Sequence, residues 1–176
     1  MFEEKCLKKT LAFDGDYLKL RKDFVELCDG TKGVREFIKA FDASCVVALD
    51  EFENIIMVKQ FRYAQKQELL EIPAGGLEKG ESPLDGAKRE LLEETGYGTQ
   101  NWEKLAVTVP TAASTQKLHI FLARDVKKIG PQNLDEGELL EVLKIPYKKV
   151  LEDVLKGEIV DSKTIVGILK YELLKN

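Results

Sequence analysis

The stretch GGLEKGESPLDGAKRELLEETGY, residues Gly75 to Tyr97, decides how this chain folds. It predicts a glycine-bearing loop followed by a helix, because Ser82 is a good N-cap, Pro83 suits the first helical position and Gly96 can take the left-handed conformation that ends a helix. The less polar residues of this helix recur at three- and four-residue steps and predict one apolar stripe. They are Leu84, Ala87, Leu91 and Thr95.

Three glutamates, Glu90, Glu93 and Glu94, lie in the second half of that helix, beyond the apolar stripe. Like charges one turn apart cost about 0.2–0.5 kcal/mol, and the helix macrodipole disfavours negative charge near the C-terminus. A divalent cation between the carboxylates would remove both penalties, and hard oxygens are what Mg²⁺ and Mn²⁺ select. Arg89, four residues before Glu93, can orient that carboxylate. The alternative is an ordinary solvated helix face, where neighbouring glutamates are common.

The segment IPAGGLEKGE before the helix favours the metal interpretation. Pro73 fixes the backbone, while Gly75, Gly76 and Gly80 let the main chain approach a ligand closely. The loop leads into a helix N-terminus, which is a favourable place for phosphate. Glycines alone are weak support because turns use them freely. The combination of this loop with the acidic helix is what indicates a metal-dependent site.

The whole stretch resembles the Nudix box, G-x5-E-x7-R-E-U-x-E-E-x-G-U, in which U is a bulky aliphatic residue. The matching residues are Gly75, Glu81, Arg89, Glu90, Leu91, Glu93, Glu94 and Gly96, and Tyr97 takes the last aliphatic position. The resemblance implies an α+β fold, the Nudix α/β/α sandwich around a mixed sheet. It also implies hydrolysis of a nucleoside diphosphate linked to another group, with Mg²⁺ or Mn²⁺ as cofactor.

Other segments resemble the ADP-ribose pyrophosphatase branch of that family. They are VKQFRYAQKQELLEIPAGG (58–76), DSKTIVGILK (161–170) and the strands before residue 43, which resemble the extra sheet through which those enzymes form homodimers. The segment PTAASTQKLHIFLA (110–123) departs from the branch, with Ala112 and Gln116 where it often has glycine and glutamate. The branch therefore suggests ADP-ribose as substrate without deciding it.

The resemblance assigns metal and catalytic roles to particular residues. It makes Glu90 and Glu94 the main metal ligands, with an oxygen from the carbonyl of Ala74 and nearby support from Glu93. Arg89 is the expected positioning residue of this group.

The resemblance also implies a catalytic base in an acidic loop far along the chain, which corresponds to LDEGELLEV (134–142). Glu136 is the first candidate, and Glu138 is a candidate base or extra metal ligand. Exposed acids are also common in loops for solubility alone, so that interpretation stays open.

Substrate-binding candidates come from three regions. Arg62 follows a predicted strand, and its planar guanidinium suits a phosphate, although a surface ion pair is the alternative. Glu71 can orient Arg62 or a ribose hydroxyl, and the backbone of Gly75 and Gly76 can approach the substrate. In the N-terminal region Arg35, next to Glu36, is the candidate for reaching a partner's site.

Strand patterns elsewhere predict a central hairpin and an N-terminal meander. Strands are predicted at Lys5–Phe13, Tyr17–Leu27, Val34–Phe41, Cys45–Leu49, Ile55–Phe61, Leu69–Ile72, Leu105–Val109, Leu118–Ala123 and Leu139–Ile145, with helices at Val150–Lys156 and after an Asp161 or Ser162 N-cap. Strands outnumber helices without alternating regularly with them, so the class is α+β with a mixed sheet plus an N-terminal antiparallel β-meander. We expect a single domain over residues 1–176, with 1–42 forming the sheet used in dimerisation.

Composition excludes several classes of protein. A formal net charge of −4 argues against a general nucleic-acid binder. No apolar run approaches a membrane span, and the N-terminus lacks a signal peptide, so we expect a cytoplasmic protein without membrane contact. Three scattered cysteines and the single histidine, His119, support neither a disulfide framework nor a zinc site.

We therefore expect an enzyme that cleaves a nucleoside diphosphate sugar, with ADP-ribose giving AMP and ribose 5-phosphate. GDP-mannose or another sugar nucleotide is the alternative substrate. A non-catalytic nucleotide-binding sensor is the alternative from a different class, and an intact set of box glutamates argues against it.

Overall fold

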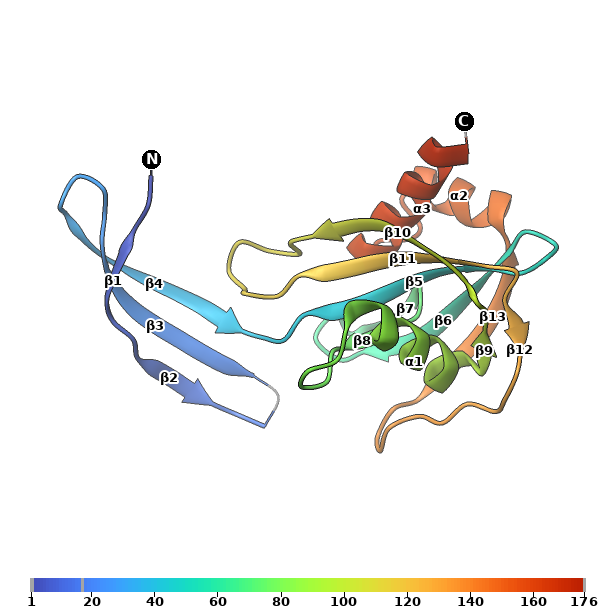
Figure 1. Cartoon of the computed structure of the whole chain (residues 1–176), viewed down its shortest axis with the longest axis horizontal. Helices are drawn as coiled ribbons and strands as arrows, with labels where there is room; N and C mark the ends of the chain where they lie inside the picture. Colours follow the sequence, from blue (N-terminus) through green and yellow to red (C-terminus); the bar gives the residue numbers. More distant parts are fainter. Residues whose placement is uncertain (1, 17, 176) are drawn as a thin grey trace. The chain divides into compact units, whose positions relative to one another are not determined.

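The computed structural model describes residues 2–16 and 18–175, and these fall into two compact units. One unit contains the chain up to Asp42 together with Val109–Lys117, and the other contains Ala43–Thr108 and the chain from Leu118 onward. Figure 1 labels the helices and strands of both. Among the residues described, no helix is long and apolar enough to cross a membrane.

The first unit is one antiparallel sheet. Its strands are β1 (Lys5–Lys8), β2 (Leu11–Asp14), β3 (Lys19–Glu26) and β4 (Lys32–Lys39). β1 and β2 pair with successive parts of one edge of β3, while β4 pairs with the other edge. The antiparallel meander is thus confirmed, but its first strand is broken. The break occurs because the amide of Thr10 donates to the buried carboxylate of Asp23 (3.3 Å) instead of to the ladder. The predicted start of the second strand, Tyr17, lies outside the described residues.

The segment Val109–Lys117 joins this sheet through β4 and the residues after it. The amide of Thr115 donates to the carbonyl of Ile38 at 3.0 Å, and Gln116 Nε2 donates to the carbonyl of Phe41 at 3.0 Å. Gln116, which departs from the branch pattern, therefore has a structural partner here.

The second unit is built on a seven-stranded mixed sheet in the order β10-β11-β5-β6-β13, with β7 beside β6 and β8 beside β5. β11 and β5 run parallel, and the other neighbours run antiparallel. The strands are β5 (Ala43–Leu49), β6 (Asn54–Arg62), β7 (Gln67–Glu71), β8 (Ala74–Gly76), β10 (Asn101–Thr108), β11 (Leu118–Arg124) and β13 (Leu140–Pro146). A separate pair, β9 (Tyr97–Gly98) and β12 (Lys127–Lys128), and the short β8 are absent from the sequence prediction because they carry no periodic pattern.

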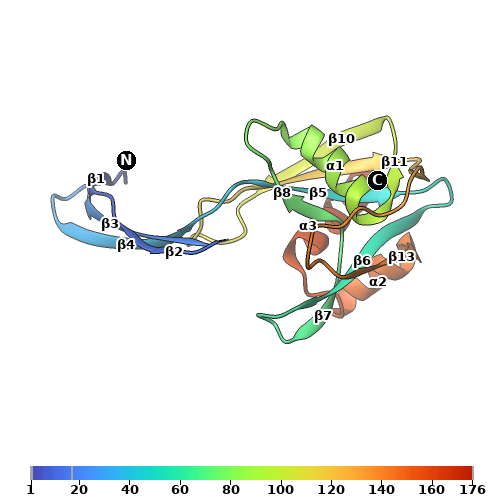
Figure 2. The same cartoon turned by 90° about the horizontal axis from the view of Figure 1, so that it is seen from below.

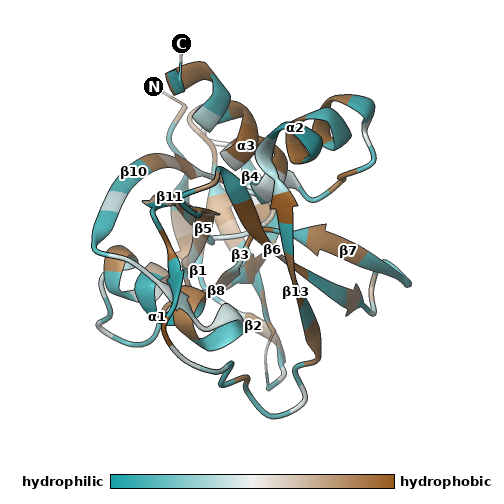
Figure 3. Ribbon diagram, turned by 90° about the vertical axis from the view of Figure 1, so that its right-hand side faces the viewer, coloured by the Kyte–Doolittle hydropathy of each residue, from teal (hydrophilic) through white to brown (hydrophobic). Residues whose placement is uncertain are grey.

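Three helices enclose this sheet and make two hydrophobic cores. α1 (Pro83–Thr95) covers one face, and α2 (Tyr147–Lys156) and α3 (Ser162–Lys175) cover the other (Figures 1 and 2). Because successive strand residues point to opposite faces, Val47 packs in the core with α2 and α3 while Val46 and Ala48 pack in the core with α1. β5 is consequently buried along its whole length, as a strand covered on both faces must be. Hydrophobic colours gather along the inner strands in Figure 3. The predicted α/β/α sandwich is confirmed.

Candidate active site

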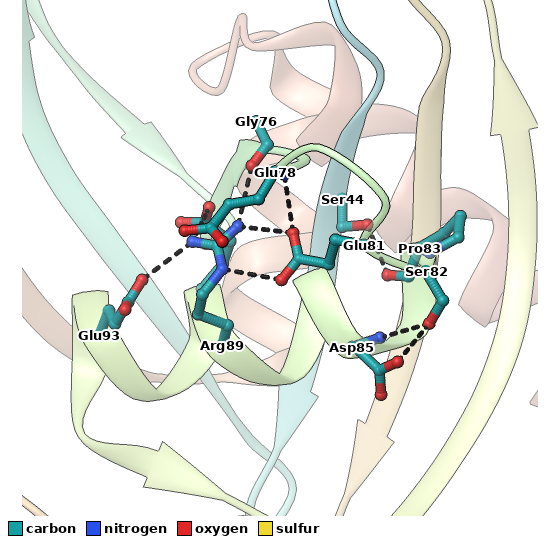
Figure 4. A network of polar contacts seen from close by, with 10 residues as sticks. Ser44, Gly76, Glu78, Glu81, Ser82, Pro83, Asp85, Arg89 and Glu93 are labelled. Carbon is teal, nitrogen blue, oxygen red and sulfur yellow. Dashed lines mark hydrogen bonds and ion pairs between the residues drawn. The ribbon is translucent and has the colours of Figure 1, made fainter.

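Helix α1 has the end signals that its sequence predicted. The Ser82 side chain accepts a hydrogen bond from the amide of Asp85 at 3.2 Å, and Pro83 begins the helix. Gly96 ends it with φ of 73°, and its amide donates to the carbonyl of Leu92 at 2.7 Å. Ser44 Oγ also donates to the carbonyl of Pro83 at 2.6 Å, which ties the helix start to β5 (Figure 4). The helix is therefore fixed at both ends.

The stripe of α1 that faces the sheet contains two of the acids. Glu90 is 9% exposed and Glu94 is 4% exposed, and they are buried beside Ala87 and Leu91. The expectation that all three glutamates lie beyond the buried stripe is therefore wrong for this pair, because the loop after β7 covers it. Glu93 alone among the three turns outward, with its side chain 35% exposed.

Arg89 binds several oxygen acceptors at once (Figure 4). It donates to both carboxylate oxygens of Glu81 at 2.9 and 3.0 Å, to Glu90 at 2.7 Å, to Glu93 at 2.9 Å and to the carbonyl of Gly76 at 2.9 Å. The predicted ion pair with Glu93 is present, but the hydrogen bonds to Glu81 dominate in raising the pKa of the Arg89 guanidinium. Arg89 thus holds the glycine loop and the carboxylate of Glu90 in one arrangement.

The predicted glycine loop begins as strand β8, and this strand lies directly against the buried carboxylates. A β-carbon built on Gly75 would overlap the carboxyl group of Glu90, so this close approach requires glycine. A β-carbon on Gly76 would meet open space instead. The amide of Ala74 donates to Glu94 Oε2 at 3.0 Å, which fixes the second carboxylate. Whether the carbonyl of Ala74 serves a metal stays a prediction.

The charges of this pair are poorly compensated by the protein. Burial, followed by the charge of Glu90, raises the pKa of Glu94 to about 8. Burial also raises the pKa of Glu90, despite its hydrogen bond from Arg89. Two buried carboxylates whose pKa values both rise need added positive charge to stay ionised. The donor chemistry therefore fits a divalent cation.

A cluster of three acidic side chains is not formed here. Across residues 2–16 and 18–175, no group of three or more His, Cys, Asp and Glu side chains could hold a metal ion. Glu93 is directed to Arg89 (Figure 4), so the remaining candidate donors are the carboxylates of Glu90 and Glu94 and backbone oxygen.

Arg62 and Glu71 form a pair at the ends of neighbouring strands. Arg62 is the last residue of β6 and Glu71 the last of β7. Arg62 Nε and Nη2 donate to the two oxygens of Glu71 at 2.7 and 2.6 Å. The Glu71 side chain is 2% exposed while that of Arg62 is 41% exposed, so the carboxylate anchors a guanidinium that solutes can reach.

The residues just before the acidic loop are hydrogen-bonded to the C-terminal end of α1. Gln132 Nε2 donates to the carbonyl of Glu94 at 2.7 Å, and the amide of Asn133 donates to the carbonyl of Glu93 at 2.9 Å. These bonds satisfy carbonyls that a helix C-terminus otherwise leaves unpaired. Sequence reasoning missed this role of Gln132, for which no local signal exists.

Beyond that anchor, Glu136 and Glu138 are both exposed. The charge of Glu138 contributes to the raised pKa of both Glu90 and Glu94. The role of Glu138 as a base or an extra metal ligand, and that of Glu136 as a base, stay predictions.

Arg35 belongs to the other unit. It lies on β4, pairs with Glu4 and donates to the carbonyl of Val34 at 3.0 Å. The neighbouring Glu36 pairs with Lys22 at 3.1 Å. The site described above is built from the second unit alone, so a role for Arg35 in substrate binding stays a prediction.

Comparisons with known proteins bear on this geometry. A family model described as NUDIX domain matches residues 39–164. The "Methanol dehydrogenase activator" of Bacillus methanolicus is 36% identical over 176 residues, which cover 98% of this chain and 95% of the relative. The "ADP-ribose pyrophosphatase" of Bacillus subtilis (strain 168) is 37% identical over 173 residues, which cover 97% and 94%.

Among solved structures, the crystal structure of an "ADP compounds hydrolase" is similar with a TM-score of 0.83. The similarity covers 98% of this chain and 95% of that one at 20% sequence identity. It shows a shared fold, including the N-terminal sheet as well as the sandwich.

Proposed function

The chain belongs to the Nudix family, and from that premise we propose that it hydrolyses the pyrophosphate bond of a nucleoside diphosphate sugar. ADP-ribose is the substrate we favour, with AMP and ribose 5-phosphate as products, because a relative that matches nearly the whole chain is named for that activity. GDP-mannose or another sugar nucleotide is the alternative, since base and sugar recognition depends on pocket residues outside the box.

The observation that carries the proposal is the burial of Glu90 and Glu94 against the glycine loop. A solvated helix face would leave both carboxylates in water, yet they are 9% and 4% exposed. Burying two like charges is costly unless a cation compensates them. A protein that only bound nucleotide as a sensor would have no need to keep this pair.

We propose Mg²⁺, or Mn²⁺ in its place, as the cofactor. Glu90, Glu94 and the carbonyl of Ala74 would hold it, with Glu93 nearby. When bound, such a cation neutralises phosphate charge and activates water.

The remaining groups bind substrate and move the proton. The exposed guanidinium of Arg62 pairs with a substrate phosphate through its planar fork. A loop carboxylate takes the proton of the attacking water. Glu138 is favoured over Glu136 for this role because its charge acts on both buried glutamates. Arg89 keeps Glu90 in place and does not touch the reacting atoms.

We also propose that the N-terminal sheet pairs two copies of the chain. Within its own unit, no described helix covers this sheet, and several large apolar side chains are exposed. They are Leu7, Leu11, Phe13, Leu18, Leu20, Phe24, Val34 and Phe41. Cross-strand pairing brings Phe13 beside Leu20 and Phe24 beside Val34, and exposed apolar side chains gathered in this way mark an interaction site in soluble proteins. Light scattering should give the mass of a homodimer, and a monomer at working concentration would exclude this use of the sheet.

The deciding experiment is a panel of sugar nucleotides, ADP-ribose and GDP-mannose included, incubated with and without Mg²⁺ and followed by product analysis. We expect cleavage at the pyrophosphate that requires the cation, with the highest kcat/KM for ADP-ribose. Binding without turnover of any member would support the sensor. The panel is needed because a relative of almost equal identity is named for activating another enzyme.

A further inference from the structure

A buried chain of hydrogen bonds ties the start of α3 to the end of β7. The amide of Ile72 donates to Thr164 Oγ1 at 2.9 Å, and that hydroxyl donates to Asp161 Oδ2 at 2.5 Å. Since the amide can only donate, the hydroxyl proton must point to Asp161. The same carboxylate oxygen caps α3 by accepting from the amide of Thr164 at 3.0 Å. These bonds hold the first turn of α3 against the residue that follows Glu71, and the side chain between Asp161 and Thr164 that also reaches Glu71 belongs to this turn.

That side chain is Lys163, which is 11% exposed. Its ammonium group forms ion pairs with Asp161 Oδ1 at 3.0 Å and with Glu71 Oε2. Glu71 is the same buried carboxylate that holds Arg62 with both oxygens. One buried anion is therefore shared by two cations, one of them internal and one of them accessible.

The charge of this cluster is balanced only when Lys163 is present. Arg62 and Lys163 carry two positive charges, and Glu71 and Asp161 carry two negative ones. Burial raises the pKa of Glu71, but the hydrogen bond from Arg62 and the charge of Lys163 outweigh burial and hold the pKa below its ordinary value. Without Lys163, the cluster has a net negative charge.

Balance matters because the cluster adjoins the buried glutamates. Glu71 is followed by Ile72, Pro73 and Ala74, and the amide of Ala74 holds Glu94. An excess negative charge here would repel a pyrophosphate and would leave Arg62 as the sole counter-ion of Glu71. A guanidinium neutralised in that way attracts a phosphate less strongly.

We propose that Lys163 is a positioning residue for substrate binding: it takes a share of the Glu71 charge and so leaves Arg62 free to bind a substrate phosphate. This inference rests on the proposed function. It predicts that Lys163 affects affinity for the anionic substrate and leaves the chemical step nearly unchanged.

The test is Lys163→Gln, which removes the charge and keeps a hydrogen-bond donor of similar reach. For the sugar nucleotide that the wild-type protein cleaves best, we expect KM to rise about tenfold, in the range found when groups behind a binding residue are lost. The kcat should stay within about twofold, which is the mark of lost ground-state binding. The Kd for ADP, measured by calorimetry with a chelator present, should rise in parallel.

Two further variants separate charge from structure. Lys163→Arg restores the positive charge, so KM should return to within about threefold of the wild-type value. Lys156→Gln is the matched control, because Lys156 on α2 pairs at 2.5 Å with Glu152 on the exposed surface. Its KM should equal that of the wild type.

The outcomes are distinguishable. If the wild-type protein cleaves no member of the panel, the proposed function fails, whatever Lys163 does. If the wild type is active, an unchanged KM in folded Lys163→Gln overturns the inference, as does a fall in kcat alone. If Lys163→Gln does not fold, Lys163→Arg decides: a KM near the wild-type value supports the inference, and a tenfold rise overturns it.

Discussion

Replacing Gly75 with alanine should disable the site without unfolding the protein. The added β-carbon would occupy the space of the Glu90 carboxyl group, whereas ordinary contact between carbon atoms needs about 3.5 Å. The carboxylate sits at the end of a flexible side chain, so it can retreat by about 1 Å without a change in the backbone. That movement would break its 2.7 Å hydrogen bond to Arg89. A displacement of about 1 Å in a catalytic group can cost about 10²-fold in rate, or about 2.7 kcal/mol in the barrier.

The assay for Gly75→Ala is kcat/KM for the best substrate of the panel, with thermal unfolding measured beside it. We expect a loss of about 10²-fold in kcat/KM, and a loss of stability of about 1–3 kcal/mol from the broken hydrogen bond, which leaves the protein folded. Gly130→Ala is the matched control, because a β-carbon there meets only Leu92 at 3.9 Å, an ordinary contact. Full activity in Gly75→Ala would refute the requirement for Glu90 in its observed place.

Three other perturbations test the remaining assignments. Glu94→Gln removes a buried charge and nearly keeps the shape of the side chain. Turnover should fall by at least about 10²-fold, while the melting temperature is kept or raised. Wild-type turnover in this variant would contradict the role of Glu94 as a metal ligand. Glu138→Gln should lower kcat by about 10²-fold or more with Mg²⁺ affinity retained, and Glu136→Gln should have a much smaller effect; the reverse order would move the base to Glu136. Burial would raise the pKa of Asp50, but hydrogen bonds from Lys144 and from the turn it caps lower that pKa from 3.8 to about 2. Its contribution to stability should therefore be present above pH 3.8 and lost as the pH falls toward 2. Urea unfolding of wild type and Asp50→Asn across this range measures the loss, and equal pH dependence in both would contradict it.

The parts of the fold that the sequence predicted well have local signals. Helix α1 begins and ends where predicted because Ser82 and Gly96 act on adjacent backbone groups. The central hairpin was predicted equally well, because β5 and β6 are continuous apolar runs with a polar turn between them.

The parts that were missed depend on contacts distant in sequence. Helical periodicity classes Glu90 and Glu94 as exposed, but in the folded chain Gly75 lies against Glu90 and the amide of Ala74 binds Glu94. Lys163 is 92 positions from Glu71, and the sequence around neither residue predicts their ion pair. For the same reason the residues of the first predicted strand, Lys5–Phe13, do not predict the break in it, which is caused by the side chain of Asp23.

The segment 129–133 joins the end of α1 to the start of the acidic loop, so the two should open together. The amides of Ile129 and Gly130 donate to the carbonyl of Gly96, and Gln132 and Asn133 bind the last carbonyls of the helix. Fraying of the helix end and release of the loop are then a single opening event, with one rate of amide hydrogen exchange. A loop insertion placed before Asn133 would separate the two, whereas one placed after it would lengthen the reach of the loop and leave the helix intact.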